Sequence, residues 1–407
     1  MIITCGTISN PDYVPETWHT YLVLLLVLFI DGLFTTQSTR FIGQLNKVGT
    51  VFNVVIVLVF IVWFPVGSIN TPKTSDSRKV WTNFENGTDW PIGWAMIMGF
   101  LTTIWTMSGY DAPFHLAEEC SNANVASPRA IVITAQLGFY LGWAVILVMA
   151  YTVTDLTAVM SGAQPFGVLC EQVLGRRAGL ALFGLNIAAQ FFVGEGCTIT
   201  ATRVVFAFAR DGALPGSRFW SRVDSRTRTP VIATWGVLAV AALLGLLSFA
   251  GPVAIGAVFS IGAIAQYTAF TGPIALKLFM GRGKFRRGPW YLGRWSRPTN
   301  AVACAWWLLI VPALCFPAAR GVDLVPQTMN WTCLIYGGAM LLAMVYYAIS
   351  ARTWFKGPRI NLDHARGPKP GHESGPRVLE GRDAQDPDDG GDGSTGGAEK
   401  KVVGSVV

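Results

Sequence analysis

An acidic residue stands beside two helix-breaking residues inside an apolar stretch. The run SGYDAP (108–113) occupies the second half of a hydrophobic segment that starts near Pro91. Pro113 has no N–H and clashes with the preceding turn, and Gly109 tolerates conformations that other residues avoid. We therefore expect the helix to break here. Asp111 beside the break could bind an ammonium group, a proton or a sodium ion; the alternative is a simple proline kink with Asp111 hydrogen-bonded internally.

A second carboxylate, Glu195, lies deep in the apolar run FFVGEGCTIT, between Gly194 and Gly196. The glycines permit close approach of a neighbouring helix. Glu195 could be a proton relay or an ion-pair partner, or it could be neutral and bonded to a nearby hydroxyl. Asp31, near the end of the first apolar run, is expected at the membrane interface. Arg203, two turns before the end of its own run, can extend its side chain to the interface.

The sequence HLAEE places His115, Glu118 and Glu119 just after the expected break. One His without a second His four residues later is a poor zinc ligand set, so we expect no metal and no cofactor. A membrane enzyme would need paired catalytic groups at one depth, which only this cluster remotely offers, and we expect no enzyme. We interpret the cluster as a helix end that faces the cytoplasm and pairs with basic residues such as Arg129. The seven cysteines are scattered without a C-x-x-C pair, which argues against disulfides and zinc.

The elements that position these residues must be membrane-spanning helices. Charged residues make up 14% of the chain and hydrophobic residues 52%, whereas an ordinary soluble domain carries about 25% charge. The apolar residues form about nine runs of the length that a bilayer requires, too long and continuous for barrel strands. The fold class is therefore all-α, a polytopic membrane helical bundle. The predicted spans are 18–35, 48–66, 92–118, 131–153, 179–208, 230–249, 253–276, 300–318 and 331–350.

The distribution of basic residues predicts the orientation. They gather in the loops that follow the first, fifth and seventh spans, which share one side if the spans number nine, and such loops are retained in the cytoplasm. The N-terminal segment 1–17 is then outside, as is the sequon at Asn86, and the C-terminus is cytoplasmic. The net charge of +7 lies in these loops, so we expect a lipid bilayer and not nucleic acid as the partner. Residues 357–407 are rich in Gly, Pro, Asp and Glu, and we predict a disordered tail, either regulatory or merely solvated.

Several runs together resemble a known family. They are SGYDAPFHLAEECSNANVASPRAIV (108–132), ATRVVFAFARDGALP (201–215), NPDYVPETWHT (10–20), GPWYLGRWSRPTNAVA (288–303) and the Asn-Trp pair that opens the last span. The chain resembles the fungal amino acid/choline permeases, which include γ-aminobutyrate (GABA) carriers, of the amino acid–polyamine–organocation superfamily. The resemblance covers residues 8–362.

The resemblance implies twelve helices with a five-plus-five inverted repeat, and a substrate held between unwound stretches of the first and sixth helices. The third span here matches the sixth helix, so the resemblance gives a substrate-binding role to Ser108, Gly109, Tyr110 and Asp111. It gives a gating or structural role to Arg203, Arg210 and Asp211, and we expect the same kind of role for Glu118 and Glu119 in the helix-end cluster. Segment 18–356 then corresponds to helices four to twelve, without a counterpart of the first three.

The function that follows is a secondary permease for an amino acid or an amine such as GABA or choline. We expect the proton as the coupling ion, with Asp111 and Glu195 as candidate relay residues. The plasma membrane is the expected location, and the vacuolar or another internal membrane is the alternative. A non-transporting paralogue, acting as a regulatory or interaction subunit, is the competing hypothesis because of the missing helices.

Overall fold

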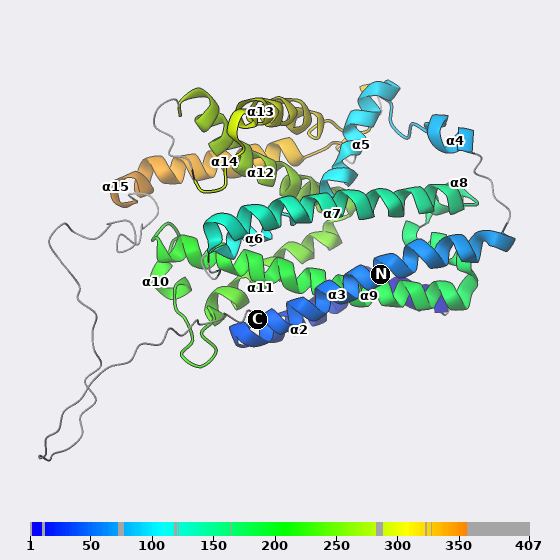
Figure 1. The fold of residues 1–407 in the computed structure, drawn as a ribbon, viewed down its shortest axis with the longest axis horizontal. Helices are drawn as coiled ribbons and strands as arrows, with labels where there is room; N and C mark the ends of the chain where they lie inside the picture. Colours follow the sequence, from blue (N-terminus) through cyan, green and yellow to red (C-terminus); the bar gives the residue numbers. More distant parts are fainter. Residues whose placement is uncertain are drawn as a thin grey trace, which may run out of the picture. The chain divides into compact units, whose positions relative to one another are not determined.

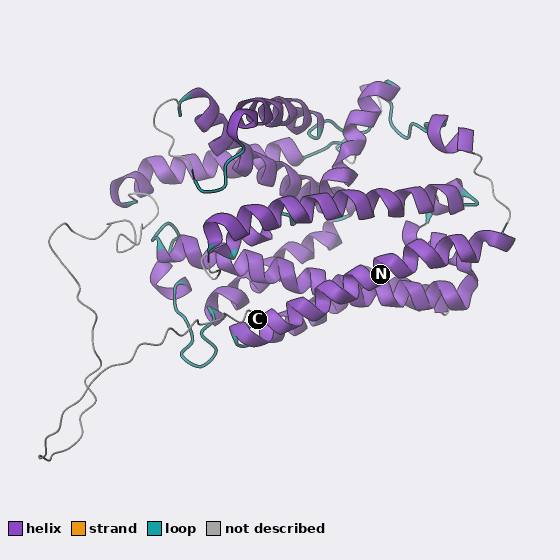
Figure 2. Cartoon of the chain, viewed as in Figure 1, coloured by secondary structure: helices purple, strands orange, loops and turns teal. Residues whose placement is uncertain are grey.

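The computed structural model is helical throughout the part of the chain that it describes, without a strand there (Figure 2). The described residues are 2–9, 13–71, 77–117, 120, 122–162, 164–281, 288–321, 324–326 and 328–355. The all-α prediction is confirmed. The predicted tail, 357–407, lies outside the described residues, as do the basic residues of 282–287.

All nine predicted spans fall on helices. The long ones are α2 (Thr17–Thr35), α3 (Thr39–Gly67), α7 (Ala123–Thr152), α9 (Pro165–Arg210), α11 (Val231–Gly245), α12 (Pro252–Phe279), α13 (Ser296–Ala313) and α14 (Thr332–Tyr346), while the third predicted span is divided into α5 (Ile92–Thr106) and α6 (Ala112–His115). Shorter helices are α1 (Ile2–Ser9), α4 (Ser77–Thr82), α8 (Leu156–Ser161), α10 (Ser217–Trp220) and α15 (Arg352–Trp354). Helix α11 continues into the 3₁₀ turn Leu246–Ala250, and α14 continues through a π-helical turn, Tyr347–Ala351.

Seven of the described helices are long and apolar enough to cross a membrane by themselves. The two predicted spans that fall short do so for visible reasons. Helix α5 has 15 residues because the chain leaves the helix after Thr106. Helix α13 has 18 residues but begins with the polar run SRPTN. Each of the nine predicted spans therefore corresponds to a helical segment. One of these segments is broken, and one begins with polar residues.

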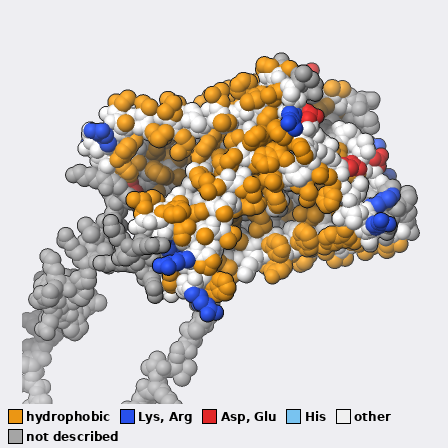
Figure 3. Space-filling model, turned by 90° about the horizontal axis from the view of Figure 1, so that it is seen from above, with side chains coloured by type: hydrophobic (Ala, Val, Ile, Leu, Met, Phe, Trp, Pro, Cys, Tyr) orange, Lys and Arg blue, Asp and Glu red, His pale blue; other side chains and the backbone are white. Residues whose placement is uncertain are grey.

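The outer faces of these helices are apolar. On α14, Leu342 is 71% exposed, and Ile349 in the π-helical turn that follows is 77% exposed. Hydrophobic side chains cover most of the face drawn in Figure 3, and charged ones lie mainly towards its ends. Exposed apolar surface of this extent marks contact with another apolar phase. Here that phase is the lipid that the helix lengths require.

The helices pack in two groups, which Figure 1 shows. Helix α9 contacts α2, α3 and α11, and α7 packs against α3. Helix α12 contacts α5, α13 and α14. The two arms of the broken span belong to different groups, since α5 contacts α12 and α13 whereas α6 contacts α7 and α9. The break therefore lies where the chain passes from one group to the other.

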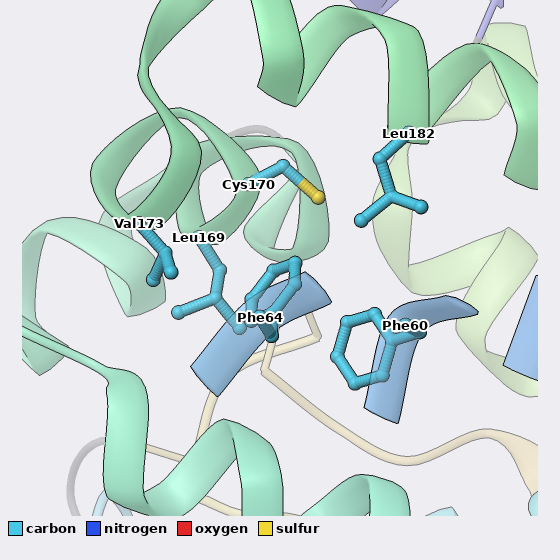
Figure 4. Close-up of a cluster of buried hydrophobic side chains, with 6 residues drawn as sticks. All are labelled: Phe60, Phe64, Leu169, Cys170, Val173 and Leu182. Atoms are coloured by element: carbon cyan, nitrogen blue, oxygen red, sulfur yellow. The ribbon is translucent and has the colours of Figure 1, made fainter. Parts of the chain in front are cut away.

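Helix α9 is itself kinked, because Gly175 adopts φ 73° and ψ 171°. Its two arms, 165–174 and 176–210, fold against each other and against α3. Figure 4 shows the resulting apolar cluster, in which Phe60 and Phe64 of α3 meet both arms of α9. The α9 members of this cluster are Leu169, Cys170, Val173 and Leu182. Close packing of this kind fixes the angle between the arms.

The kink requires a glycine where the arms cross. A Cβ atom on Gly179 would lie 2.7 Å from the carbonyl oxygen of Cys170. We expect Gly179→Ala to destabilise the protein by about 1–3 kcal/mol, since two backbone segments would have to separate. Gly184→Ala is the matched control on the same helix, because nothing lies within 4 Å of its Cβ position. Thermal unfolding in detergent measures both, and equal melting temperatures for the two variants would contradict this packing.

The loop between α9 and α11 is held by a carboxylate. Oδ2 of Asp224 accepts hydrogen bonds from the backbone N–H of Thr227 and of Arg226, both at 2.9 Å. These donors stabilise the charged form and lower the pKa of Asp224, the Thr227 bond most. The loop is joined to α2 by Thr229, whose hydroxyl donates to the carbonyl oxygen of Thr36 at 3.2 Å.

The lowered pKa predicts a pH-dependent stability. A group whose pKa falls on folding stabilises the folded state above its unfolded pKa, ~3.9 for Asp, and this stabilisation is lost as the pH drops through the folded value. Asp224→Asn should melt below the unaltered protein at pH 5 to 7, and the difference should close as the pH falls below about 4. Melting curves across this range measure it. A difference that does not change with pH would show that the charge has no part in holding the loop.

Candidate functional site

The predicted helix break is present. Helix α5 ends at Thr106, and the chain passes through consecutive turns to Ala112, with Gly109 at φ 92°. Within these turns Ser108 N–H donates to Trp105 C=O at 3.1 Å and Ala112 N–H donates to Gly109 C=O at 3.2 Å. Both bonds reach three residues back and not four, so the α-helical ladder is interrupted. The positive φ explains why the chain uses glycine at this point.

A glutamine from α12 bridges the break. The Ser108 hydroxyl donates to Oε1 of Gln266 at 2.9 Å, and Nε2 of Gln266 donates to Oδ1 of Asp111 at 2.9 Å. One amide therefore satisfies a hydroxyl and a carboxylate on opposite sides of Gly109. The helices can approach because α12 has a glycine, Gly262, whose Cβ position lies 3.3 Å from the Trp105 ring.

The other carboxylate oxygen of Asp111 faces α6. Nε2 of His115 lies 3.0 Å from Oδ2 of Asp111, four residues away on the same helical face. The side chains are 13% exposed for Asp111 and 21% for His115. The internal hydrogen bonding that was the alternative for Asp111 is therefore present. Each carboxylate oxygen of Asp111 makes one hydrogen bond, whereas a carboxylate can accept about four in total, so Asp111 can still bind a ligand.

The far side of the break is anchored to α7. The Ser127 hydroxyl, near the start of α7, donates to the carbonyl oxygen of Pro113 at 3.0 Å. An interrupted helix in an apolar phase needs such partners, because each unsatisfied backbone group there costs several kcal/mol. Ser127 is buried, which strengthens the electrostatic part of the bond.

An open pocket of about 470 Å³ adjoins the break. Met107 and Tyr110 from the break line it together with α7 and Tyr267 of α12. Its walls are mostly apolar and aromatic, with Phe139 and Tyr140 on the α7 side. Tyr110 also lies 6.1 Å from Phe270, measured between ring centroids. Aromatic walls suit an organic cation, which is attracted by the faces of the rings, and Asp111 follows the lining residue Tyr110 in the chain without itself lining the pocket.

The second predicted carboxylate, Glu195, is completely buried in α9. The sequence places Asp31 at the membrane interface, but the structure buries its side chain to 2% exposure on α2. Oδ2 of Asp31 lies against the backbone of Gly194, where a Cβ would come within 3.1 Å. The burial of Asp31 was not predicted from the sequence; helix packing produces it by bringing the carboxylate beside the residue that precedes Glu195. The interfacial depth expected for Asp31 stays a prediction.

Three of the residues expected to gate the protein lie in α9 or at its end. Arg210 and Asp211 stand at the end of α9, with Nε of Arg210 3.5 Å from Oδ1 of Asp211. Gly212, at φ 81°, ends the helix: its N–H donates to Ala209 C=O, and the next N–H donates to Phe208 C=O. This is a Schellman cap, so the ARDGALP run has a structural explanation. Arg203 lies two turns earlier on α9, and Glu118 and Glu119 fall outside the described residues.

Three contributors were missed in the sequence: Gln266, Ser127 and the burial of Asp31. An amide inside the apolar run AVFSIGAIAQYTAF was a usable signal for Gln266, since polar groups within spans seek partners. Among the described residues, no group of three His, Cys, Asp or Glu side chains is placed to hold a metal ion.

Membrane-spanning helices, one of which is broken at a carboxylate, are typical of one class of protein, the polytopic membrane transporters. The chain belongs to the amino acid permease family, which matches residues 1–339. The predicted family, and with it a transporter and not an enzyme, is confirmed.

Curated relatives agree with this family. An uncharacterized amino-acid permease of Schizosaccharomyces pombe is 43% identical over 89% of this chain and 68% of its own length. A putative polyamine transporter of Candida albicans is 35% identical over 89% of this chain and 67% of its own. A GABA-specific permease of Saccharomyces cerevisiae is 30% identical over 81% of this chain and 58% of its own. The chain thus spans about two thirds or less of the length of these relatives.

The bridge across the break predicts a measurable loss of stability. Gln266→Ala removes both hydrogen bonds, one of them to a carboxylate, and should cost about 1–3 kcal/mol. Gln190→Ala on α9 is the control, since Gln190 is exposed and its loss should change stability by less than about 0.5 kcal/mol. Thermal unfolding of the purified variants measures both. If Gln266→Ala melts at the same temperature as Gln190→Ala, the Gln266 amide does not hold the two arms of the broken span, α5 and α6, together.

Proposed function

We propose that this chain carries small amines or amino acids across a membrane, with the ammonium group bound at Asp111. The observation that carries the proposal is the position of this carboxylate: it lies at an interrupted helix and follows Tyr110 in the chain, a residue that lines an open pocket with aromatic walls. Ser108, Gly109 and Tyr110 complete the proposed substrate site. Ser108 supplies a hydroxyl, Gly109 a backbone segment outside the regular helical hydrogen bonding, and Tyr110 an aromatic ring.

The electrostatics of the break favour a cation. Helix α5 has 15 residues and its C-terminus points into the turns before Asp111. The C-terminal end of a helix carries a partial negative charge, which attracts cations. The dipole and the carboxylate therefore act in the same direction. A polyamine, choline or the amino group of GABA fits this chemistry, in keeping with relatives named as a polyamine transporter and a GABA-specific permease.

We propose proton symport as the source of energy, with Asp111 and Glu195 as relay residues. Both are carboxylates inside spans, where a charge is expensive and protonation removes it. The plasma membrane is the proposed location, with the vacuolar or another internal membrane as the alternative. The proposed orientation places 1–17 outside and the tail 357–407 in the cytoplasm, with 18–356 as helices four to twelve of a permease.

Radiolabelled uptake tests the proposal. Cells that lack endogenous carriers would express the chain and receive putrescine, choline or GABA. We expect uptake of at least one of them, and we expect Asp111→Asn to raise its KM roughly 10- to 100-fold, since a hydrogen bond to a charged group contributes about 1.5–3 kcal/mol. Asp111→Glu keeps the charge and should retain part of the uptake.

Glu171→Gln is the control, because Glu171 is exposed on the first arm of α9 and lies outside the proposed site. Surface expression of each variant is measured alongside. Absence of uptake of all three compounds by well-expressed protein would overturn the proposed transport and favour a non-transporting subunit. An unchanged KM in Asp111→Asn would leave transport intact and remove Asp111 from the site.

A further inference from the structure

Two carboxylates with unpartnered oxygens are buried side by side between α2 and α9. Asp31 is 2% exposed and Glu195 is 0% exposed. Oδ1 of Asp31 and both carboxylate oxygens of Glu195 are without a hydrogen-bond partner in the described part of the chain. Buried polar groups are nearly always hydrogen-bonded, and buried charges are nearly always paired. This pair therefore requires a hydrogen-bond donor or a positive charge, which two ionised carboxylates do not supply.

The Asp31 carboxylate packs against the part of α9 that carries Glu195. Oδ2 of Asp31 approaches the Gly194 backbone so closely that a Cβ there would lie 3.1 Å away, and Gly194 is the residue that precedes Glu195. Two ionised carboxylates held close together would repel each other. One turn after Asp31 on α2, the hydroxyl of Thr35 is also buried and unpartnered. The two carboxylates are thus buried on adjoining parts of α2 and α9, and each has an unsatisfied oxygen.

The third wall of this site is apolar. Gly32 of α2 packs against Leu238 and Trp235 of α11, whose side chains would lie within 2.7 and 2.9 Å of a Cβ at Gly32. Helix α11 and the 3₁₀ turn that follows it carry no ionisable residue. No counter-charge is therefore available from this side.

The other packed elements contribute few ionisable groups. Helix α9 itself has Cys197 two residues and Arg203 two turns beyond Glu195, and α1 contributes only Cys5. Helix α3 contributes Arg40 and the exposed Lys47, while α6 contributes His115 and the turns before it Asp111.

We propose that Asp31 and Glu195 together form a proton-binding site, which holds one shared proton between the two carboxylates and takes up and releases it during the transport cycle. The proton comes from water and returns to water, and no covalent bond other than O–H is made or broken. Sharing one proton removes one of two repelling charges and creates an O–H···O⁻ bond, which is among the strongest hydrogen bonds in proteins. The proposal rests on the proposed function, to which it adds the place of the coupling proton and the residue Asp31.

Infrared difference spectroscopy tests the site without transport. The purified protein would be taken through a pH step, and the C=O stretch of a protonated carboxylic acid recorded. We expect one band whose frequency and pH midpoint both change in Asp31→Asn and in Glu195→Gln, because the proton belongs to the pair and the carboxylate that remains has lost its partner. A band with unchanged frequency and midpoint in either variant, or the absence of any carboxylic-acid band in the unaltered protein, would overturn the proposal.

A matched pair of glycine variants tests the geometry. Gly194→Ala places a methyl group against the Asp31 carboxylate, whereas Gly196→Ala meets nothing within 4 Å. We expect the band and its pH midpoint to shift in Gly194→Ala and to stay unchanged in Gly196→Ala. Equal spectra in the two variants would contradict the assignment to the Asp31 side of α9.

Transport assays distinguish a failure of the proton-binding site from a failure of the proposed transport function. In proteoliposomes, Glu195→Gln should lose accumulation driven by a pH gradient but retain exchange of labelled for unlabelled amine. If Glu195→Gln accumulates as much amine as the unaltered protein, the pair has no role in coupling. If a sodium gradient drives accumulation by the unaltered protein, the coupling ion is a monovalent metal ion and not the proton. Failure of the unaltered protein to exchange any amine, with the infrared band present, would remove the transport function and leave the proton site.

Discussion

A polar group in an apolar phase must find its partner within the protein, and this constraint accounts for the arrangement around residues 107–115. Interrupting a helix in lipid releases backbone groups from their ladder. The structure compensates with side chains from other helices: Ser127 of α7 donates to the carbonyl of Pro113, and Gln266 of α12 joins Ser108 to Asp111. The break is consequently held by long-range contacts, and its geometry depends on the helices around it.

The same contacts connect the two packing groups. One arm of the break, α5, lies against α12 and α13, and the other arm, α6, lies against α7 and α9. A ligand at Asp111 would bind where the chain crosses between the groups, so its binding energy would act on both. Alternating access needs such a location, because the substrate must bias how one set of helices sits against another.

Local pattern in the sequence was sufficient for part of this account. Gly109 and Pro113 predicted the break, and apolar runs predicted all nine helical segments, because both effects act over a few residues. The bridge by Gln266 joins residues 155 positions apart, and the burial of Asp31 depends on a glycine of α9. No local pattern contains such contacts. The kink at Gly175 was not predicted for a related reason: Gly175 lies before the predicted span 179–208, beside Arg176 and Arg177, and only packing shows that the helix extends across it and bends there.

The central claim is that an amine binds at the interrupted helix, and hydrogen–deuterium exchange across residues 105–117 tests it most directly. Backbone amides outside a regular ladder exchange by small local openings, and a bound ligand slows them. With purified protein and saturating putrescine, the account predicts slower exchange in this segment and unchanged exchange in α14, Thr332–Tyr346. Exchange in 105–117 that is the same with and without the amine would contradict it.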